Sequence, residues 1–265
     1  MVCIWCVSTG IMHHIKKHLL HIKIGYYCMY LCKWEELPKE YQISELRRYY
    51  EILSRRKHSL VLKRMFDIVV SLLMLLILSP VFFFLAIAIK IDSKGPVFYR
   101  QMRITQYGKI FRIHKFRSMI TGADRGSLVT VGADSRITRV GRLIRKYRLD
   151  EISQLIDILE GTMTFVGTRP EVPKYVESYT PEMLATLLLP AGVTSFASIM
   201  YKDEAELLEQ SSDPDRAYIE KVLPEKMKYN LYGIKNFSFF GDIKIMFMTF
   251  LAVCGKEYNL KVKND

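Results

Sequence analysis

Residues 68–89 read IVVSLLMLLILSPVFFFLAIAI, a run of 22 residues without a charged side chain. As one straight helix this run would be about 33 Å long, enough to cross a hydrocarbon core of ~30 Å. An uncharged run of this length is rare inside a soluble domain of this size. The run therefore predicts a membrane-embedded helix, which either spans the bilayer or returns to the face it entered.

The centre of the run carries a helix break, Ser79-Pro80. Pro80 has no N–H for the carbonyl of Leu76 and its ring clashes there, so the helix must bend. Ser79 can donate a hydrogen bond to a freed carbonyl, which makes the break tolerable in lipid. The two arms would each be about 14–17 Å long, roughly half of the bilayer core.

Basic residues flank both ends of the run. Lys63 and Arg64 precede it, and Lys90 and Lys94 follow it. A simple span is expected to carry its Lys and Arg excess on the cytoplasmic side only. The paired flanks therefore favour a re-entrant membrane helix, a hairpin over residues 63–94, with a kinked single span as the alternative.

The composition indicates an anionic partner. The chain has 265 residues, and its 39 Lys and Arg exceed its 27 Asp and Glu by 12. Such a surplus is typical of proteins that meet nucleic acid, lipid headgroups or phosphorylated substrates. With a strong apolar run and no recognisable nucleic-acid-binding motif, we expect membrane lipids and phosphorylated molecules as partners, and no nucleic acid.

The N-terminal segment is compositionally odd. Four of the five cysteines lie in the first 32 residues, at Cys3, Cys6, Cys28 and Cys32, near four histidines. A zinc site is one interpretation, although the second pair is unusually spaced. The segment does not have the pattern of a signal peptide. We interpret residues 1–28 as an extension of doubtful significance, with a more ordinary sequence from Met29.

Three stretches have amphipathic helical patterns. The first is in residues 29–62, where Leu46, Tyr49, Tyr50 and Leu53 recur at helical spacing between basic residues. Residues 139–148 follow with a basic amphipathic pattern, and residues 237–253 are apolar with two charges inside. The first suits an anionic surface or is an ordinary solvated helix. The second could lie on anionic lipid or face a diphosphate, and the third would lie in the membrane interface or under the domain.

Residues 110–117 alternate apolar and basic side chains, which predicts a half-buried strand. A second short strand before a turn near Gly108 would complete a small β-hairpin. The hairpin would carry a dense basic group: Arg100, Arg103, Lys115 and Arg117. Either this group binds phosphate, or it is the solvated edge of a sheet.

Two adjacent acids, Asp150 and Glu151, open an apolar-faced helical pattern over residues 149–159. Helix capping would explain them. Chemistry would also explain them, because an ionised carboxylate can attack phosphorus and a neighbouring acid can hold a divalent cation. Downstream, Arg169 stands before Pro170 in a glycine-punctuated loop, as a forked donor suited to phosphate.

Five motifs in this order carry a family resemblance. They are Lys63-Arg64 before the Ser79-Pro80 hairpin, GPVFYRQ at 95–101, KFRSM at 115–119, LDE at 149–151 and VGTRPE at 166–171. Over about residues 60–255 the chain resembles the bacterial sugar transferase family, the monotopic polyprenyl-phosphate phosphoglycosyl transferases. Where this family usually has Pro-Arg-Pro, the chain has Thr168, which relaxes the loop before Arg169. Thr162 and Ser195 also depart from the family pattern.

The resemblance implies an α+β, mostly helical, monotopic membrane protein with a re-entrant helical hairpin, a small β-hairpin and amphipathic interfacial helices. Residues 95–255 would form a cytosolic catalytic domain on the cytoplasmic face of the bacterial inner membrane. Residues 256–265 would be a polar tail. The sequence leaves the oligomeric state open, a homo-oligomer included.

The resemblance also implies an activity: transfer of a sugar-1-phosphate from a UDP-sugar to undecaprenyl phosphate, with Mg²⁺, to begin a surface polysaccharide. Asp150 would be the nucleophile and Glu151 its partner, and both would serve the metal. We expect donor contacts from Lys115, Arg117, Arg169, Arg100 and Arg148. Lys63 and Arg64 would meet the acceptor phosphate. A membrane scaffold without catalysis and a phosphohydrolase using the same Asp150 are the competing hypotheses.

Overall fold

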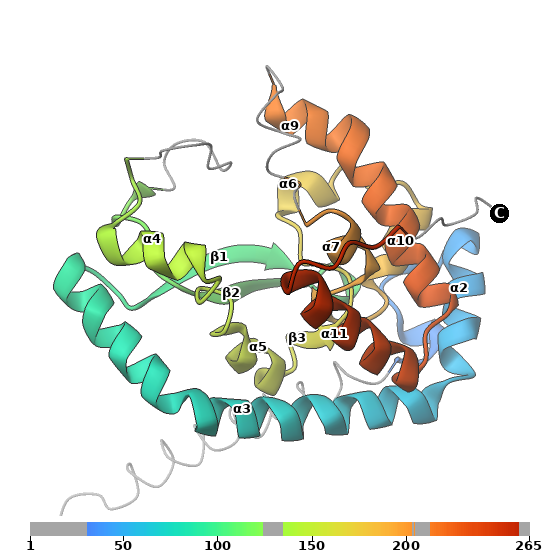
Figure 1. Cartoon of the computed structure of the whole chain (residues 1–265). Helices are drawn as coiled ribbons and strands as arrows, with labels where there is room; N and C mark the ends of the chain where they lie inside the picture. Colours follow the sequence, from blue (N-terminus) through green and yellow to red (C-terminus); the bar gives the residue numbers. More distant parts are fainter. Residues whose placement is uncertain (1–30, 124–134, 203, 205–212, 260–265) are drawn as a thin grey trace, which may run out of the picture.

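The structure, a computed structural model, describes residues 31–123, 135–202, 204 and 213–259 (Figure 1). The predicted extension at 1–28, with Cys3, Cys6 and Cys28, lies outside the described residues. So does most of the predicted tail, from residue 260 onward. The described part is mostly helical, as the sequence predicts, and has two small sheets.

A single long helix, α3 (Lys57–Asp92), runs along one side of the molecule and bends partway along its length (Figure 1). Ser79 Oγ donates to the carbonyl of Leu76 at 2.8 Å, which is the acceptor that Pro80 leaves without a donor. The predicted bend and its compensation are both present. Helical structure continues through the bend, and the return of the chain to the same membrane face stays a prediction.

The surface of α3 suits lipid. Among the described residues it is the one helix long and apolar enough to cross a membrane, with a mean hydropathy of 2.9 in its most apolar window. Only 6% of that window is buried inside the protein. Its exposed apolar side chains include Leu72, Leu73, Ile77, Phe83 and Phe84. None of the other described residues covers these side chains, and such an exposed apolar surface suits membrane association.

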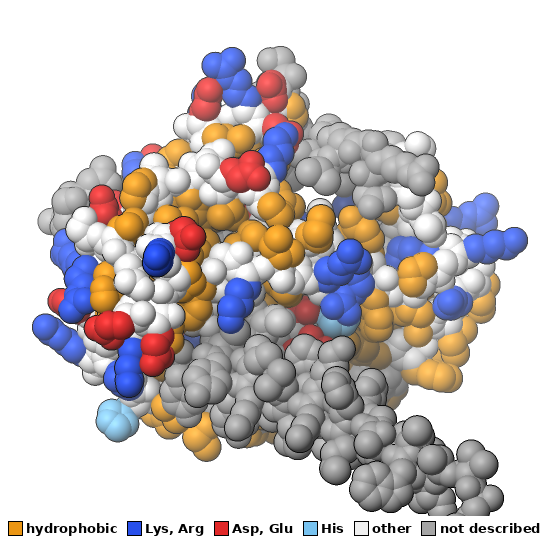
Figure 2. All heavy atoms as spheres, turned by 180° about the vertical axis from the view of Figure 1, so that it is seen from behind, with side chains coloured by type: hydrophobic (Ala, Val, Ile, Leu, Met, Phe, Trp, Pro, Cys, Tyr) orange, Lys and Arg blue, Asp and Glu red, His pale blue; other side chains and the backbone are white. Residues whose placement is uncertain are grey.

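The C-terminal stretch forms α11 (Phe239–Val253), a helix that packs against α3. Phe240, Phe247, Phe250 and Val253 are exposed on it, while Ile245 and Met248 are buried. The predicted amphipathic helix is therefore present. Figure 2, which shows the molecule from behind, has Lys and Arg side chains scattered over this face with hydrophobic side chains among them.

The predicted β-hairpin is confirmed. Strands β1 (Phe98–Ile104) and β2 (Ile110–Phe116) pair antiparallel, with Phe98 opposite Phe116 and Ile104 opposite Ile110. The turn uses a left-handed backbone at Tyr107 (φ 56°) and Gly108 (φ 72°). Because side chains alternate along a strand, the hairpin has two distinct faces, and only one of them meets the functional site.

A second sheet was not predicted. Strands β3 (Met163–Val166) and β4 (Ala191–Thr194) pair parallel, with Met163 opposite Ala191. At the end of this pair the backbone of Gly192 lies against Gly167, and a Cβ on Gly192 would be 2.1 Å from the Gly167 nitrogen. Only glycine permits this approach, which fixes the start of the loop that carries Arg169.

The apolar face of α2 (Ser44–Ser54) is inside the protein. Leu46, Tyr49 and Leu53 are buried in a cluster that the 3₁₀-helix Glu182–Leu187 and α10 (Leu223–Lys235) complete. Of the two interpretations of this helix, a helix on an anionic surface and an ordinary solvated helix, the buried apolar face favours the second. The pattern was sufficient to predict the helix but not its partner.

The remaining helices are short and surround the two sheets. They are α4 (Arg139–Lys146), α5 (Gln154–Glu160), α6 (Pro173–Val176), α7 (Phe196–Met200) and α9 (Pro214–Ala217). A π-helical turn, Tyr218–Val222, joins α9 to α10. The basic helix expected at 139–148 is α4, and the helix expected from residue 149 begins later, at Gln154.

Candidate active site

The two adjacent acids lie in the turn between α4 and α5. Helix α5 begins at Gln154 and its N-cap position is Ser153, so neither Asp150 nor Glu151 caps it. The capping explanation is therefore wrong. The turn is entered through Arg148, a non-glycine residue in the left-handed region (φ 51°), where backbone strain is common near functional sites.

The turn is held against the β-hairpin. The amide of Phe116 donates to the carbonyl of Asp150 at 3.3 Å, which brings Asp150 to the end of β2. A small cavity adjoins this point, lined by Arg103, Ile113, Lys115, Gln154, Arg169 and Pro170. Its lining comes from β1, β2, the start of α5 and the loop after β3, and contains neither Asp150 nor Glu151. Of its three cations, Arg169 pairs with Glu151, and the charge of Lys115 interacts with both carboxylates.

Glu151 is paired with Arg169. Arg169 Nη2 donates to Glu151 Oε1 at 2.5 Å, and the Glu151 side chain is 20% exposed. Burial by itself would raise the pKa of Glu151, but the charge and hydrogen bond of Arg169, with Lys115 and Arg148 nearby, outweigh it and lower that pKa to about 2. Glu151 is thus a permanent anion at neutral pH.

Asp150 has the opposite tendency. Burial and the neighbouring charge of Glu151 raise the pKa of Asp150, while Lys115 and Arg145 work against this rise. The two adjacent carboxylates therefore differ in their ease of protonation, a pattern found where two acids have different chemical roles. A partly desolvated carboxylate is also a better nucleophile than a fully hydrated one.

Lys115 faces the cavity from β2. Burial, with the charges of Arg169 and Arg103, lowers the pKa of Lys115 to about 8, although Glu151 and Asp150 favour its charged form. Three cations that crowd one cavity repel one another, so the site is prepared for a multiply charged anion. The predicted donor contacts Lys115 and Arg169 thus lie together.

Strand alternation separates the other predicted basic residues. Tyr99 lies opposite Lys115 in the hairpin, so Arg103 shares the face of Lys115 and Arg100 does not. Arg100 instead donates to the carbonyl of Arg112 at 2.7 and 3.0 Å. The structure thus places Arg100 away from the cavity, and the predicted substrate contact of Arg100 does not fit this position. Arg103 lines the cavity instead, where its guanidinium donates to the Pro170 carbonyl at 3.2 Å and to Gln101 Oε1 at 2.7 Å. Counting residue parity from Lys115 would have found it.

Gln154 was also missed. It is 2% exposed and lines the cavity at the first turn of α5. A buried amide offers both a donor and an acceptor to a ligand in the cavity. Its position three residues after Glu151 is the only feature of the sequence that could have indicated Gln154 as a site residue.

Arg117 has a structural role. It is 5% exposed, and its guanidinium donates to the carbonyls of Ser93 and Lys94 at 2.7 Å and of Ile89 at 3.4 Å. The carbonyls of Ser93 and Lys94 follow the last turn of α3 and have no intrahelical donor, whereas that of Ile89 also accepts from the Ser93 amide at 3.1 Å. The prediction that Arg117 contacts donor phosphate does not fit this position, because the side chain is buried and both Nη atoms already donate at the helix end.

Lys63 and Arg64 are also used internally. Lys63 is 4% exposed, and its Nζ lies 2.6 Å from both Asp242 Oδ2 and the Val166 carbonyl. Arg64 donates to the carbonyls of Ile158 and Leu159, at 2.7 and 3.0 Å. Both residues therefore join α3 to the rest of the protein, and the buried position of Lys63 does not fit the predicted contact with the acceptor phosphate.

A second cluster lies on the other face of the hairpin. His114, Asp157 and Glu160 bring their ligand atoms within 4.8 Å of one another, as a metal site would require. However, both Asp157 oxygens already accept hydrogen bonds from His114, and the Arg100 guanidinium contacts the His114 ring. A cation there would meet a fixed positive charge, so we interpret this cluster as structural.

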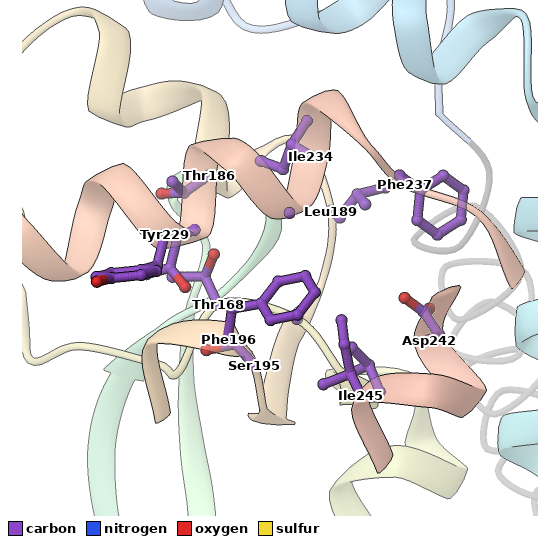
Figure 3. A pocket seen from close by; sticks show the side chains of 14 residues that line it. Thr168, Thr186, Leu189, Ser195, Phe196, Tyr229, Ile234, Phe237, Asp242 and Ile245 are labelled. Carbon is purple, nitrogen blue, oxygen red and sulfur yellow. The ribbon is translucent and has the colours of Figure 1, made fainter. Parts of the chain in front are cut away.

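Another cavity, of about 50 Å³, lies behind the loop that follows β3 (Figure 3). Figure 3 shows Thr168 and Ser195 on one side of it and Asp242 on the other, with the ring of Phe196 between. Neither Asp150 nor Glu151 lines this cavity. Asn230 lines it with a buried side-chain oxygen that has no hydrogen-bond partner among the described residues. This volume has room for one or two waters.

A carboxylate pair beside a cationic cavity, on a domain attached to an exposed apolar helix, defines a membrane-associated enzyme of phosphate chemistry. The chain belongs to the bacterial sugar transferase family, which matches residues 58–256. This confirms the family that the five sequence motifs indicated.

Named relatives are consistent with this membership. The chain is 34% identical to a UDP-glucose:undecaprenyl-phosphate glucose-1-phosphate transferase of Klebsiella pneumoniae, over 72% of this chain and 40% of the relative. It is 32% identical to a UDP-N-acetylgalactosamine-undecaprenyl-phosphate N-acetylgalactosaminephosphotransferase of Aeromonas hydrophila, over 72% of this chain and 43% of the relative. It is 35% identical to the exopolysaccharide production protein PSS of Rhizobium leguminosarum bv. phaseoli, over 73% of this chain and 95% of the relative. The match thus spans about two-fifths of the first two relatives and nearly all of the third.

Proposed function

We propose that this protein transfers a sugar-1-phosphate from a UDP-sugar to undecaprenyl phosphate, the initiating step of a surface polysaccharide. The observation that carries the proposal is the placement of Asp150 and Glu151 beside a cavity lined by Arg103, Lys115 and Arg169. The names of the relatives support both the undecaprenyl-phosphate acceptor and the nucleotide-sugar donor.

The chemistry follows from the two acids. A carboxylate oxygen of Asp150 bonds to the sugar-bearing phosphorus of the donor, and the P–O bond to UMP breaks, so that UMP leaves with the electron pair. A phosphate oxygen of undecaprenyl phosphate then bonds to the same phosphorus and the Asp150–phosphorus bond breaks. The product is undecaprenyl diphosphate sugar with the carboxylate restored. Two easier steps replace one difficult step.

The cations of the site prepare the donor for attack. Arg103, Lys115 and Arg169 offer charge-assisted hydrogen bonds to the diphosphate, and their mutual repulsion falls when the anion arrives. Phosphoryl transfer depends chiefly on such positioning and charge stabilisation. Arg169 would exchange part of its contact with Glu151 for a phosphate oxygen.

The residues fit a magnesium ion. Carboxylate oxygens are the ligands that Mg²⁺ prefers, and Glu151 stays ionised while Asp150 lies next to it. Glu151 and Asp150 would hold the ion together with donor phosphate oxygens. When bound, Mg²⁺ would neutralise the charge that develops on the leaving phosphate.

We further propose that α3 is re-entrant and that the domain over residues 95–255 faces the cytoplasm at the inner membrane. The bend of α3 and its exposed apolar surface support this arrangement. A water-soluble donor and a lipid phosphate can then meet at one membrane face.

A donor panel tests the activity. The full chain, in lipid nanodiscs with Mg²⁺ and undecaprenyl phosphate, is given a set of UDP-sugars, and UMP release and lipid-linked sugar are measured. We expect one or a few donors to react and Asp150→Asn to abolish transfer. Asp215→Asn, which changes a carboxylate on the surface helix α9, is the matched control and should retain activity.

Three outcomes would contradict the proposal. UMP release without undecaprenyl phosphate and without lipid product would indicate water as acceptor, and so a phosphohydrolase. No reaction with any donor in folded protein would favour a non-catalytic scaffold. Full transfer activity in Asp150→Asn would remove Asp150 from the chemistry.

A further inference from the structure

The outer edge of β2 is covered by side chains and a turn instead of a third strand. Its sheet has two strands among the described residues, and β1 occupies one edge of β2. On the other edge, the amide of His114 donates to Asp157 Oδ2 at 2.9 Å and the amide of Phe116 donates to the Asp150 carbonyl at 3.3 Å. The carbonyl of His114 accepts from Ser153 Oγ at 2.9 Å. The turn that carries the carboxylates thus docks along a strand edge.

Ser153 is the central connection of this docking. Its side chain is fully buried, and its hydroxyl lies 2.9 Å from the His114 carbonyl and 3.0 Å from the Asp150 carbonyl. A serine at a helix N-cap ordinarily accepts a hydrogen bond from an amide of the first turn. Ser153 occupies the N-cap of α5 without making that bond. Its hydroxyl is directed to the strand instead of to its own helix.

Asp157 supplies the second connection, one helical turn later. Its two carboxylate oxygens accept from the amide and from the Nδ1 of His114, at 2.9 and 2.8 Å. The residue between His114 and Phe116 is Lys115, whose side chain faces the cavity. The strand residues that hold the turn are therefore the two neighbours of the cavity lysine.

We infer that Ser153 and Asp157 are positioning residues that hold Asp150 in register with Lys115. The inference rests on the proposed function, because it assigns these residues to the geometry of the same attack. A slip of one residue along a strand moves a group by about 3.3 Å. A misplacement of about 1 Å can already cost 100-fold in rate.

The experiment compares Ser153→Ala, Asp157→Ala and Asp157→Asn with the wild-type protein in nanodiscs. We expect kcat for UMP release to fall about tenfold or more in both alanine variants, while the donor Kd stays within about threefold, because the phosphate contacts remain. Asp157→Asn keeps an acceptor for the His114 amide, so its kcat should stay within about threefold of wild type.

A control separates positioning from general destabilisation. Ser238 caps α11, where its Oγ accepts from the Gly241 amide at 3.0 Å, and it lies outside the cavity. Ser238→Ala should lower thermal stability without lowering kcat. Hydrogen exchange at the amides of His114 and Phe116 gives a readout that needs no substrate. We expect faster exchange at Phe116 in Ser153→Ala and at His114 in Asp157→Ala.

Each of these measurements can overturn the inference about Ser153 and Asp157. An unchanged kcat in Ser153→Ala, a matching fall in Ser238→Ala, or a rise in donor Kd in proportion to the loss of kcat would overturn the inference. So would unchanged amide exchange in the alanine variants. If wild-type protein releases no UMP from any donor, the proposed function fails, and the exchange rates still report whether the turn is held by Ser153 and Asp157.

Discussion

Lys63 Nζ lies 2.6 Å from Asp242 Oδ2 and joins α3 to α11 across 179 residues of sequence. Both side chains are buried, and Lys63 also donates to the carbonyl of Val166 at the end of β3. One turn further along α3, Asp67 accepts from Thr164 Oγ1 at 2.7 Å. The long apolar helix is therefore attached to the rest of the protein through buried polar groups on one face.

Breaking the Lys63–Asp242 pair should destabilise the fold strongly. Removing one partner leaves a buried charge uncompensated, which costs about 3–5 kcal/mol. We expect Lys63→Met and Asp242→Leu each to lower Tm by about 10 °C, and the double variant to recover most of this loss. Thermal unfolding in detergent micelles measures it. Independent, additive losses in the double variant would mean that the two residues do not act as a pair.

Activity should depend on pH through Lys115 and Asp150. The pKa of Lys115 is lowered to about 8, so its charge is present below pH 8 and lost as pH rises above it. The pKa of Asp150 is raised, so the nucleophile is lost on acidification at a higher pH than for an ordinary aspartate. We expect a bell-shaped profile of kcat/KM, which reports the free enzyme.

Lys115→Arg is the control for this profile. Arginine stays charged throughout the range, so the alkaline limb near pH 8 should disappear in this variant while the acidic limb remains. Initial rates of UMP release between pH 5 and 10 measure both limbs. An alkaline limb that persists in Lys115→Arg would assign it to a different group.

Arg103 and Arg100 form a matched pair on opposite faces of β1. We expect Arg103→Met to raise the KM for the nucleotide-sugar by about tenfold or more, because a charged hydrogen bond to phosphate is worth about 1.5–3 kcal/mol. Arg100→Met should leave KM within about threefold, since its guanidinium bonds the Arg112 carbonyl outside the cavity. Equal effects of the two changes would show that strand parity does not decide which arginine meets the donor.

Arg117→Met should lower stability and leave donor affinity unchanged. The guanidinium satisfies three carbonyls at the end of α3, and hydrogen bonds of a charged group contribute about 1.5–3 kcal/mol. Thermal unfolding and equilibrium binding of the donor, measured on one preparation, separate the two effects. A weaker donor affinity with normal stability would restore the phosphate-binding role that the motif suggested.

The topology of α3 can be tested at Glu51. In a variant whose native cysteines are replaced by serine, Glu51→Cys should react with a membrane-impermeant maleimide only after the cells are permeabilised. This follows if the chain enters and leaves the membrane by the cytoplasmic face. Labelling in intact cells would instead indicate a kinked span with α2 outside.

Patterns with a strong local cause were readable from the sequence. The uncharged run with Ser79-Pro80 gives a bent apolar helix because a proline removes a specific backbone donor, whatever surrounds it. The alternation at 110–117 gives a strand for an equally local reason. Asp150 and Glu151 could be singled out because two adjacent acids between a basic helical pattern and an apolar one have few structural roles besides helix capping.

The partners of long basic side chains were not readable in this way. Arg117, Lys63 and Arg100 belong to the same charged motifs as Lys115 and Arg169, yet they are bound to carbonyls or to a buried acid. A flexible cation reaches whichever acceptor the fold brings near, and those acceptors lie up to 179 residues away in sequence. The β3–β4 pair was missed for a similar reason, because a four-residue parallel strand has no partner nearby in the chain.

The sequence by itself therefore determined the membrane helix, the β-hairpin, the carboxylate pair and the family. Only the tertiary structure decided which cations meet the carboxylates and which support the scaffold. The physical reason is that helix breaks and strand alternation are properties of neighbouring residues. The environment of a charge, and hence its pKa and its partner, depends on distant segments that fold against it.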